Sequence, residues 1–393
     1  MERVAILSAV RTPIGKFLGS YADVSAVDLG VAATRAALDR AGLPADAVNE
    51  LIYGCARQAA GGPNMARQVA VGSGLPNERP AFTVNQACGS GLQSILMGAE
   101  RIRAGRARVV LAGGAENMTR VPYYLDRARL GYRLGHAPLV DGMYRDGFLD
   151  PICGLLMGET AEKLADLYAI PRREQDEYAL ESQRRAGEAI RTGRFEAELA
   201  PVPVAGRKGE TKLVAADGHP RPATTIEELA ALPPVFRKDG SVTAGNASGI
   251  TDGAASLVLA AESVARERGR TPLAWVGEAE VVGVDPSIMG IGPVPATRAL
   301  LARTGRKLPD YDLIELNEAF AAQVLACDRE LHFDRSRLNV NGGAIALGHP
   351  IGCTGARIVT TLVHEMIRRG SSLGLATLCV SGGLGLAAEI ERN

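Results

Sequence analysis

The chain has 393 residues, of which 46% are hydrophobic and 22% are charged. This length fits two or three domains, and this balance is typical of a globular α/β protein rather than a disordered one. The 44 basic and 44 acidic residues cancel, so no overall field is available to hold nucleic acid or an anionic membrane. No apolar run approaches the roughly 20 residues that cross a bilayer.

Short apolar runs surround a helical pattern in the first third of the chain. Residues 28–41 carry apolar side chains at helical spacing, which predicts an α-helix that Asp28 opens and Gly42 closes. Apolar runs that end in small residues predict buried strands at residues 4–10, 51–56 and 109–115. Strands and helices are therefore expected to alternate.

The middle of the chain has a different amino-acid composition. Residues 123–150 are rich in Tyr, Arg and Gly, and residues 200–234 are rich in proline and charge. An amphipathic helix is expected between them at residues 171–191, with Pro171 at its start and Glu174 in its first turn. This lapse in the alternation predicts an inserted loop domain that contains its own helix.

The last third of the chain repeats the pattern of the first. Strands are expected at residues 313–316 and 373–380, and helices at residues 318–331 and 355–369. In both thirds a glycine-rich turn, CGSG or GHPIGCTG, precedes a helix and then an apolar strand. This weak internal repeat favours two similar α/β halves.

Cysteine is the residue type with the clearest chemical potential. None of the six forms a CxxC pair or a disulfide-framework spacing, and the N-terminus lacks signal-peptide regions, so we expect free thiols in a reducing, cytoplasmic setting. In VNQACGSGLQSI, Cys88 sits just before an expected helix, where a thiol is either a nucleophile with a lowered pKa or a packed filler. Gly89 and Gly91 would let a substrate approach the backbone. The cysteines are Cys55, Cys88, Cys153, Cys327, Cys353 and Cys379.

Three further motifs carry candidate groups. GGAIALGHPIGCTGAR places His349 on a spare loop, where its neutral ring either activates a thiol or caps the loop. ATLCVSGGLG ends a strand at Cys379, which is either a proton carrier or a buried structural residue. DLIELNEAFAAQ places Asn317 between a strand and a helix, as an N-cap or as a polarising amide.

Taken together and in this order, NQACGSGLQS, GGAENM, TAGNASGITDGAA, NEAFAAQ, NVNGGAIALGHPIGCTGAR and CVSGGLG resemble the thiolase family, the acetyl-CoA C-acyltransferases and acetyl-CoA acetyltransferases. The resemblance covers nearly the whole chain. It implies an α/β fold of duplicated α/β/α halves, five-layered αβαβα, with an inserted loop domain. The expected domains are residues 1–118 plus 250–270, residues 119–249 as the loop domain, and residues 271–393. The resemblance also implies a homodimer or homotetramer.

The resemblance assigns a role to each motif. Cys88 would be the nucleophile that accepts the acyl group, His349 the base that activates it, and Cys379 the acid or base at the acetyl-CoA methyl carbon. Asn317, through a water, would join His349 in one oxyanion hole, and the backbone N–H groups of Cys88 and Ser381 would form the other. The reaction is CoA-dependent cleavage of a 3-oxoacyl-CoA, or its reverse, with CoA as a substrate and no cofactor.

Two departures from the family pattern bear on backbone and substrate. Ser381 replaces the first of three glycines, so we predict that it has an allowed backbone conformation or a local hydrogen bond. Leu156 replaces the His of biosynthetic acetoacetyl-CoA thiolases, which favours longer acyl chains and a degradative role in β-oxidation. The positions that resemble substrate- and CoA-contacting ones are Leu156, Met157, Ala247, Ser248, Met289, Ala319 and Phe320.

Several alternatives remain at this level. A ketoacyl-ACP synthase would lack the second cysteine, and a silent lipid-binding relative would have lost Cys88, His349 or Cys379. A dinucleotide-binding GxGxxG and metal-ligand spacings are absent from the sequence, so no metal is expected. Acyl-chain length, direction and the choice between dimer and tetramer stay open. The basic residues Arg207, Lys208, Arg221 and Arg237 either bind the CoA nucleotide or are solvated.

Overall fold

The computed structural model describes residues 2–206 and 210–392, so Arg207 and Lys208 lie outside the described residues. No helix of the described part is both long and apolar enough to cross a membrane. The strands are β1 Val4–Arg11, β2 Gly15–Lys16, β3 Glu50–Gly54, β4 Ala81–Val84, β5 Val109–Asn117, β6 Tyr123–Tyr124, β7 Val140–Asp141, β8 Val202–Ala205, β9 Thr211–Val214, β10 Thr251–Ala261, β11 Ala274–Gly283, β12 Leu313–Leu316, β13 Leu373–Val380 and β14 Leu384–Glu391.

Helices fall between these strands in both thirds where alternation was expected. They are α1 Ala26–Ala41, α2 Met65–Gly72, α3 Ser90–Arg103, α4 Met157–Leu167, α5 Arg172–Arg191, α6 Ile226–Ala230, α7 Glu262–Glu267, α8 Pro293–Thr304, α9 Ala321–Leu331, α10 Ala344–Leu347 and α11 Ile351–Arg369. Short helical turns are η1 Ala45–Ala47, η2 Met118–Arg120, η3 Tyr144–Phe148, η5 Pro286–Ile291 and η6 Leu308–Asp310.

The main strands form one mixed sheet that consists of two similar parts. The order is β12-β13-β14-β11-β1-β10-β5-β3-β4, and the parts meet where β1 pairs antiparallel with β11. Within the parts, β3 runs parallel to β4 and β5, and β12 runs parallel to β13. Most of their strands are buried along almost their whole length, which is why they read as apolar runs, whereas β4 and the second half of β11 are only partly buried.

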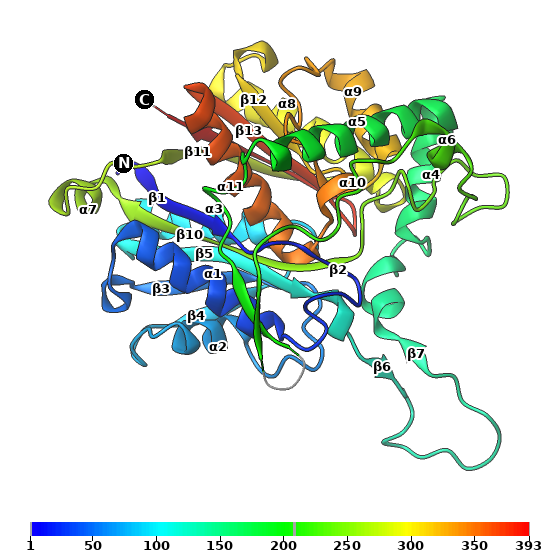
Figure 1. Cartoon of the computed structure of the whole chain (residues 1–393), viewed down its shortest axis with the longest axis horizontal. Helices are drawn as coiled ribbons and strands as arrows, with labels where there is room; N and C mark the ends of the chain where they lie inside the picture. Colours follow the sequence, from blue (N-terminus) through cyan, green and yellow to red (C-terminus); the bar gives the residue numbers. More distant parts are fainter. Residues whose placement is uncertain (1, 207–209, 393) are drawn as a thin grey trace.

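The helices complete five layers around these two sheet parts (Figure 1). Helices α1 and α2 cover the outer face of β10, β5, β3 and β4, whereas α8 covers β11, β13 and β14. Helices α3 and α11 lie between the parts, where α11 contacts strands of both. The predicted αβαβα arrangement is confirmed, and the helices that follow the two glycine-rich turns are the pair in the central layer.

Helix boundaries differ from the sequence expectation in three places. Helix α1 is capped by Ser25, and Asp28 is the third helical residue of a capping box, so Asp28 does not open the helix. Helix α9 begins at Ala321 because Phe320 is extended and pairs with Ala247. Helix α11 begins at Ile351, four residues earlier than expected. Gly352 and Gly355, which suggested a loop, lie inside the helix and allow it to pack closely on its neighbours.

Glycines allow the central helices to approach each other and the sheet. A Cβ on Gly91 of α3 would lie 2.7 Å from the backbone nitrogen of Ala356 in α11, and one on Gly352 would lie 2.7 Å from the Cα of Cys55. The expectation that Gly91 admits substrate is therefore wrong, because this glycine faces the neighbouring helix backbone. Close backbone packing is the property that requires glycine here.

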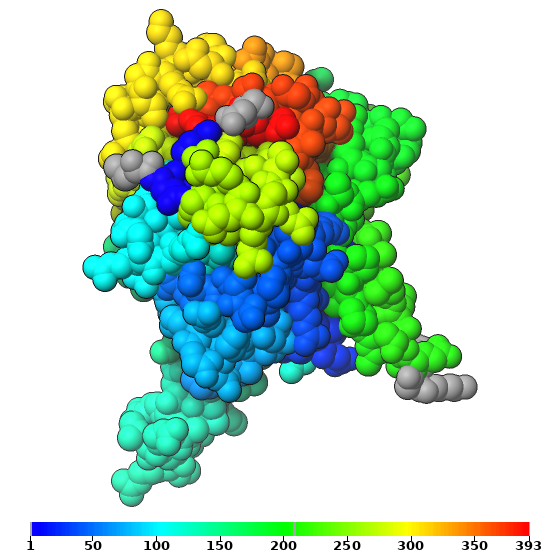
Figure 2. Space-filling model, turned by 90° about the vertical axis from the view of Figure 1, so that its left-hand side faces the viewer, coloured from blue at the N-terminus to red at the C-terminus, as the bar shows by residue number. Residues whose placement is uncertain are grey.

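The segment between β5 and β10 carries the elements expected of an insertion. It contains α4, α5, α6 and the hairpins β6–β7 and β8–β9. The chain around β6 and β7 extends away from the body as an arm, visible at the lower right of Figure 1 and the lower left of Figure 2. The large apolar side chains exposed on this arm are Tyr123, Leu125, Leu130, Tyr132, Leu134 and Leu139.

Candidate active site

The candidate nucleophile lies on a strained turn between β4 and α3. Ala87, immediately before Cys88, has a φ of 44°, a conformation that is uncommon for a residue with a side chain. The Ser90 hydroxyl holds this turn, because it donates to the Ala87 carbonyl at 2.7 Å and accepts the Gln86 N–H at 2.8 Å. The turn places Cys88 just before Gly89, the N-cap of α3, and leaves the thiol half-buried.

His349 is oriented toward this thiol by a chain of hydrogen bonds. Its Nε2 lies 3.3 Å from the Cys88 Sγ, and its Nδ1 lies 2.6 Å from the Thr354 hydroxyl. Thr354 donates its one hydroxyl proton to the Pro350 carbonyl at 3.0 Å, so this oxygen accepts from Nδ1–H. The tautomer assigned by this chain leaves the Nε2 lone pair free to accept the Cys88 proton.

The environment keeps both partners neutral. Burial lowers the pKa of His349 to about 3, with Arg357 and Arg57 acting in the same direction. Burial raises the pKa of the Cys88 thiol above its ordinary value, although hydrogen bonds from the Ser381 and Cys88 backbones and the charge of Arg57 lower it. The helix N-terminus was expected to give a lowered pKa, and desolvation outweighs that effect. The pair is therefore a thiol beside an unprotonated imidazole.

Cys379 and Asn317 approach from the other half of the chain. Cys379 is buried in β13 near its end, and burial together with the nearby Cys88 raises its pKa well above the ordinary value. The Asn317 N–H donates to the Thr377 carbonyl at 3.0 Å, which fixes Asn317 beside this strand. Its side-chain amide is fully buried, and neither its oxygen nor its nitrogen has a hydrogen-bond partner among the described residues.

The sequence left open whether Asn317 is a helix cap. Helix α9 starts at Ala321 with Phe320 in the N-cap position, so Asn317 does not cap it. A buried unpaired amide costs about 1–3 kcal/mol of stability, which favours a ligand-directed side chain over a structural one.

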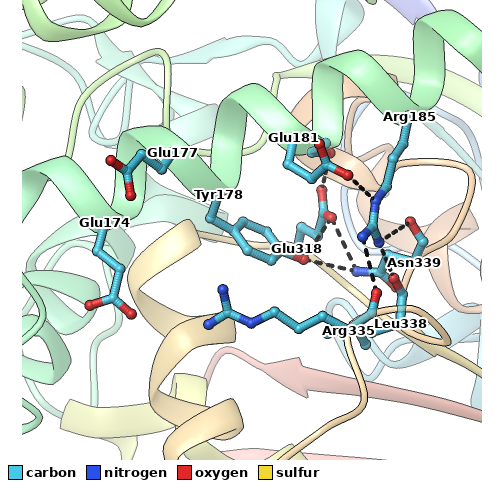
Figure 3. Close-up of a pocket in the computed structure, with 10 residues that line it drawn as sticks. Glu174, Glu177, Tyr178, Glu181, Arg185, Glu318, Arg335, Leu338 and Asn339 are labelled. Carbon is cyan, nitrogen blue, oxygen red and sulfur yellow. Dashed lines mark hydrogen bonds and ion pairs between the residues drawn. The ribbon is translucent and has the colours of Figure 1, made fainter.

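Glu318 anchors the segment that carries Asn317. One of its carboxylate oxygens accepts from the Tyr178 hydroxyl at 2.9 Å and the Asn339 amide at 3.1 Å. The other accepts from the Ser182 hydroxyl at 2.7 Å and the Ile345 N–H at 3.1 Å. Figure 3 shows Tyr178 of α5 and Asn339 directed at this carboxylate, beside a small polar hollow. Glu318 thereby ties the insertion to the C-terminal half.

One cavity of about 330 Å³ brings most of the predicted site together. Cys88, His349 and Cys379 line it, as does Ser381, whereas Asn317 lies outside the lining. The glycines at 382 and 383 have positive φ, whereas Ser381 is not among the described residues that do. The prediction that Ser381 has an allowed backbone conformation is therefore confirmed. All predicted substrate-contacting residues line the same cavity, namely Leu156, Met157, Ala247, Ser248, Met289, Ala319 and Phe320.

Sequence reasoning missed four residues that shape this site. Thr354 orients His349. The sequence feature that could have revealed it is a hydroxyl residue one helical turn into the helix that follows the histidine. The Phe236 ring meets Phe320 edge-on with centroids 6.3 Å apart, and it lines the cavity. Arg57 lines the cavity directly after β3. Glu116 of the GGAENM motif is buried beneath it.

Glu116 joins the two loops that present the reactive pair. Its carboxylate accepts N–H groups of Ala56 and Arg57, both at 3.0 Å, and of Gly352 at 2.8 Å. The end of β3 is thus fixed to the start of α11, next to His349. Among residues 2–206 and 210–392, no group of three or more His, Cys, Asp or Glu side chains is placed to hold a metal ion.

Family models match almost the whole chain: "Thiolase, N-terminal domain" at residues 4–263 and "Thiolase, C-terminal domain" at residues 270–392. The chain belongs to the thiolase family. It is 51% identical to an acetyl-CoA acetyltransferase of Pseudomonas aeruginosa over 393 residues, with 100% of both chains covered. Thiolases are acyltransferases, and this enzyme exchanges acyl groups between 3-oxoacyl-CoA and CoA through an acyl-cysteine.

Solved thiolase structures share the fold of this chain. The acetyl-CoA acetyltransferase of Bacillus anthracis superposes with a TM-score of 0.97 and 47% identity, covering 100% of this chain and 99% of that one. Human mitochondrial 3-ketoacyl-CoA thiolase in complex with CoA gives a TM-score of 0.96 and 44% identity, covering 100% and 98%. The similar thiolases therefore carry both names, acetyltransferase and 3-ketoacyl-CoA thiolase.

Proposed function

We propose that Cys88, His349, Cys379 and Asn317 carry out the reaction of this thiolase. The observation that supports this most directly is the 3.3 Å approach of His349 Nε2 to the Cys88 sulfur in a cavity that Cys379 also lines. Cleavage of a 3-oxoacyl thioester needs a nucleophile with a base in hydrogen-bond range. It also needs a second group that carries a proton to and from the leaving carbon.

The proposed cycle has two halves. His349 takes the Cys88 proton, the thiolate attacks the 3-oxo carbon, and the bond between C2 and C3 breaks. The leaving acetyl-CoA enolate takes a proton from Cys379. Incoming CoA then gives its thiol proton to the Cys379 thiolate and attacks the acyl thioester, which releases the shortened acyl-CoA, and His349 returns its proton to Cys88. Such a cycle has ping-pong kinetics.

Two oxyanions form in this cycle, and each needs donors. We assign one to the backbone N–H groups of Cys88 and Ser381, which already act on the Cys88 sulfur. The other is assigned to His349 and, through a water, to the unpaired amide of Asn317. An oxyanion donor typically contributes about 3 kcal/mol to lowering the barrier.

The acyl chain is proposed to be longer than that of acetoacetyl-CoA, in a degradative role. The cavity lining is mostly apolar, and Leu156 and Met157 occupy the wall where the biosynthetic pattern has a histidine. The relatives named acetyl-CoA acetyltransferase favour the short-chain alternative. Loss of 3-oxoacyl-CoA absorbance on adding CoA, measured for acetoacetyl-CoA and a medium-chain substrate, separates the two. A higher kcat/KM for acetoacetyl-CoA would contradict the longer chain.

For the CoA nucleotide, the structure distinguishes the remaining basic residues. Arg237 forms ion pairs with Asp166 and Glu162, which occupy its guanidinium. The Arg221 side chain has no ion pair among the described residues, and it lines a second cavity that shares Ala244 with the first. We therefore assign a phosphate contact to Arg221, to be tested by a raised KM for CoA in Arg221→Leu.

We further propose that the chain assembles as a homodimer or homotetramer. The arm around β6 and β7 exposes large apolar side chains, with Leu134 fully exposed, and such patches mark association surfaces. Sedimentation of the wild type gives the assembly state. A cytoplasmic location is proposed as well, because all six cysteines are free, as in a reducing compartment.

A further inference from the structure

Arg57 is a charged residue at an unexpected place. It follows β3 by three residues, is 9% exposed, and lines the cavity that contains Cys88. With His349 neutral, Arg57 is the only charged side chain among the described residues that line this cavity. Burying an unpaired guanidinium in an apolar lining is costly, so the charge needs an explanation.

The structure provides no direct hydrogen bond or ion pair for this charge among residues 2–206 and 210–392, and the Arg57 Nε is buried without a partner. The nearest opposite charges act from a distance: Arg57 lowers the pKa of the buried Glu116. It also lines a neighbouring hollow with Asp146 and Asp150. Its position is set by packing, because a Cβ on Gly147 in η3 would overlap the guanidinium. Glycine at 147 therefore leaves room for the guanidinium at the cavity wall.

Two internal roles for Arg57 explain it poorly. Its charge lowers the pKa of both Cys88 and His349. It thus favours the thiolate and disfavours the imidazolium, and these effects oppose each other when the proton passes between the two groups. Neutralising Glu116 is the other role, and Arg57 does lower the pKa of that carboxyl group. Glu116 nevertheless takes its hydrogen bonds from three backbone N–H groups and forms no ion pair with Arg57, so the guanidinium hydrogen-bond donors stay unused.

The cavity also has two distinct apolar walls. One consists of Met289, Ala319 and Phe320 around Cys379, with Met157, Phe236 and Ala247 packed on it. The other is formed by Ile351, Cys88 and Phe148, which line the cavity and pack on a buried cluster of Ala56, Met118 and Met143 behind it. Arg57 directly follows Ala56 in the chain and lines the cavity together with Cys88, Phe148 and Ile351.

We propose that Arg57 is a specificity-determining residue that binds a terminal carboxylate of the acyl chain, so that the enzyme accepts 3-oxoacyl-CoA substrates derived from dicarboxylic acids. This inference rests on the proposed role of Cys88 as the acyl acceptor. A guanidinium pairs with a carboxylate through two parallel hydrogen bonds. The substrate carboxylate would thereby supply the direct hydrogen-bonded ion pair that the described residues do not give Arg57.

The experiment compares two substrates of equal chain length. They are the CoA thioesters of 3-oxohexanoic acid and 3-oxohexanedioic acid, which differ in the terminal methyl and carboxylate. For the wild type, kcat/KM is expected to be higher for the dicarboxylic substrate. In Arg57→Leu the ratio of the two kcat/KM values should fall roughly 10- to 100-fold, as expected for a lost charged hydrogen-bonded pair.

Matched variants keep this test decisive. Arg57→Lys retains the charge and should keep part of the preference, whereas Arg145→Leu should leave it unchanged. Arg145 borders the neighbouring hollow and is paired with Asp126, but it does not line the acyl cavity. If Arg57→Leu does not fold, the wild-type ratio decides, and a wild-type preference for the 3-oxohexanoyl substrate overturns the proposal.

The remaining outcomes are also distinguishable. If Arg57→Leu lowers kcat/KM for both substrates by the same factor, Arg57 supports the reactive pair and the carboxylate subsite is wrong. If the wild type cleaves neither substrate with CoA, the proposed function itself fails. Cleavage of the 3-oxohexanoyl substrate alone leaves the proposed function standing and rejects only this inference.

Discussion

The two sides of the cavity hold their reactive groups in different ways. On one side, a chain of hydrogen bonds within the protein runs from the Pro350 carbonyl through Thr354 and His349 to Cys88 and fixes these groups in place. On the other side, the Cys379 sulfur has no hydrogen bond to another described side chain, and neither has the Asn317 amide, which lies behind the cavity lining. The first side is organised before substrate arrives, and the second is completed by the substrate. Substitutions on the two sides should therefore fail in different steps.

The largest effect is expected from the preorganised side. Cys88→Ala removes the proposed nucleophile, so CoA-dependent cleavage of 3-oxoacyl-CoA should fall roughly 10⁴-fold or more. Mass spectrometry should also find no acyl adduct on the protein. Cys153→Ala, a thiol outside the cavity lining, serves as the control. Acylation of Cys88→Ala at another residue with retained turnover would contradict the assignment.

Cys379→Ala should abolish a different step. Without a proton donor for the enolate, cleavage is expected to fall about 10³-fold, within the usual range for acid–base catalysis. Exchange of the acetyl group between acetyl-CoA and labelled CoA breaks no carbon–carbon bond. In exchange, unlike cleavage, His349 can give the Cys88 proton to the leaving CoA and take a proton from the incoming one, so exchange should persist near the wild-type rate. Equal loss of cleavage and exchange would mean that Cys379 also supports acyl transfer to Cys88.

Asn317→Ala should reduce kcat about 100-fold, the usual effect of losing one oxyanion donor. Because the amide makes no hydrogen bond to the described protein, its removal relieves the cost of an unpaired buried group, which offsets the cavity left behind. The melting temperature should therefore not fall appreciably. Thermal unfolding measured beside kcat separates the two effects. A large drop in melting temperature with nearly normal kcat would indicate a structural residue instead.

Thr354→Val tests whether the hydrogen-bond chain sets the tautomer of His349. Without the hydroxyl acceptor, the ring proton is free to move to Nε2, which faces Cys88. We expect cleavage to fall about 10-fold, in line with the cost of one lost hydrogen bond. Thr354→Ser restores the acceptor and should recover most of the rate. No recovery in the serine variant would show that packing of the methyl group matters more.

The smallest effect concerns the pH dependence of Cys88 reactivity, which should lack the step near pH 6.5 that protonation of an ordinary histidine would give. With a pKa of about 3, His349 stays unprotonated down to pH 5. The Cys88 thiol, whose pKa is raised, stays protonated near pH 7. Alkylation of Cys88 by iodoacetamide should therefore rise with pH through 7–9, with no step near pH 6.5. A plateau already reached below pH 7 would reveal a thiolate–imidazolium pair.

The sequence pointed to the three thiol and imidazole groups that line the cavity and to most of the fold, because these signals are local, but it did not reveal Thr354. Cys88, His349 and Cys379 each lie in a glycine-rich motif, and the strands and central helices follow from apolar periodicity. The same reasoning misplaced the start of α11, where glycines suggested a loop. Burial of α11 on all sides overrides the low helix propensity of Gly352 and Gly355.

Contacts between distant segments account for what the sequence did not reveal. The setting of Arg57 combines the end of β3, Gly147 in the insertion and the wall around Ile351, and no local pattern links these segments. The pKa of Cys88 is likewise decided by burial, which depends on the whole cavity. The helix N-terminus alone, which is visible in the sequence, gives the wrong direction.

The central position of α11 has a consequence for protein synthesis. This helix, whose last residue is Arg369, covers β5 and β10 of the N-terminal half and packs on α3. A ribosome must therefore translate nearly the entire chain before the inner face of the first half is shielded from solvent. Until then, α3 and β5 present apolar surface of the kind that makes incompletely folded chains prone to aggregate. The two halves have similar architectures, yet the core of the first half is completed only by a helix from the second.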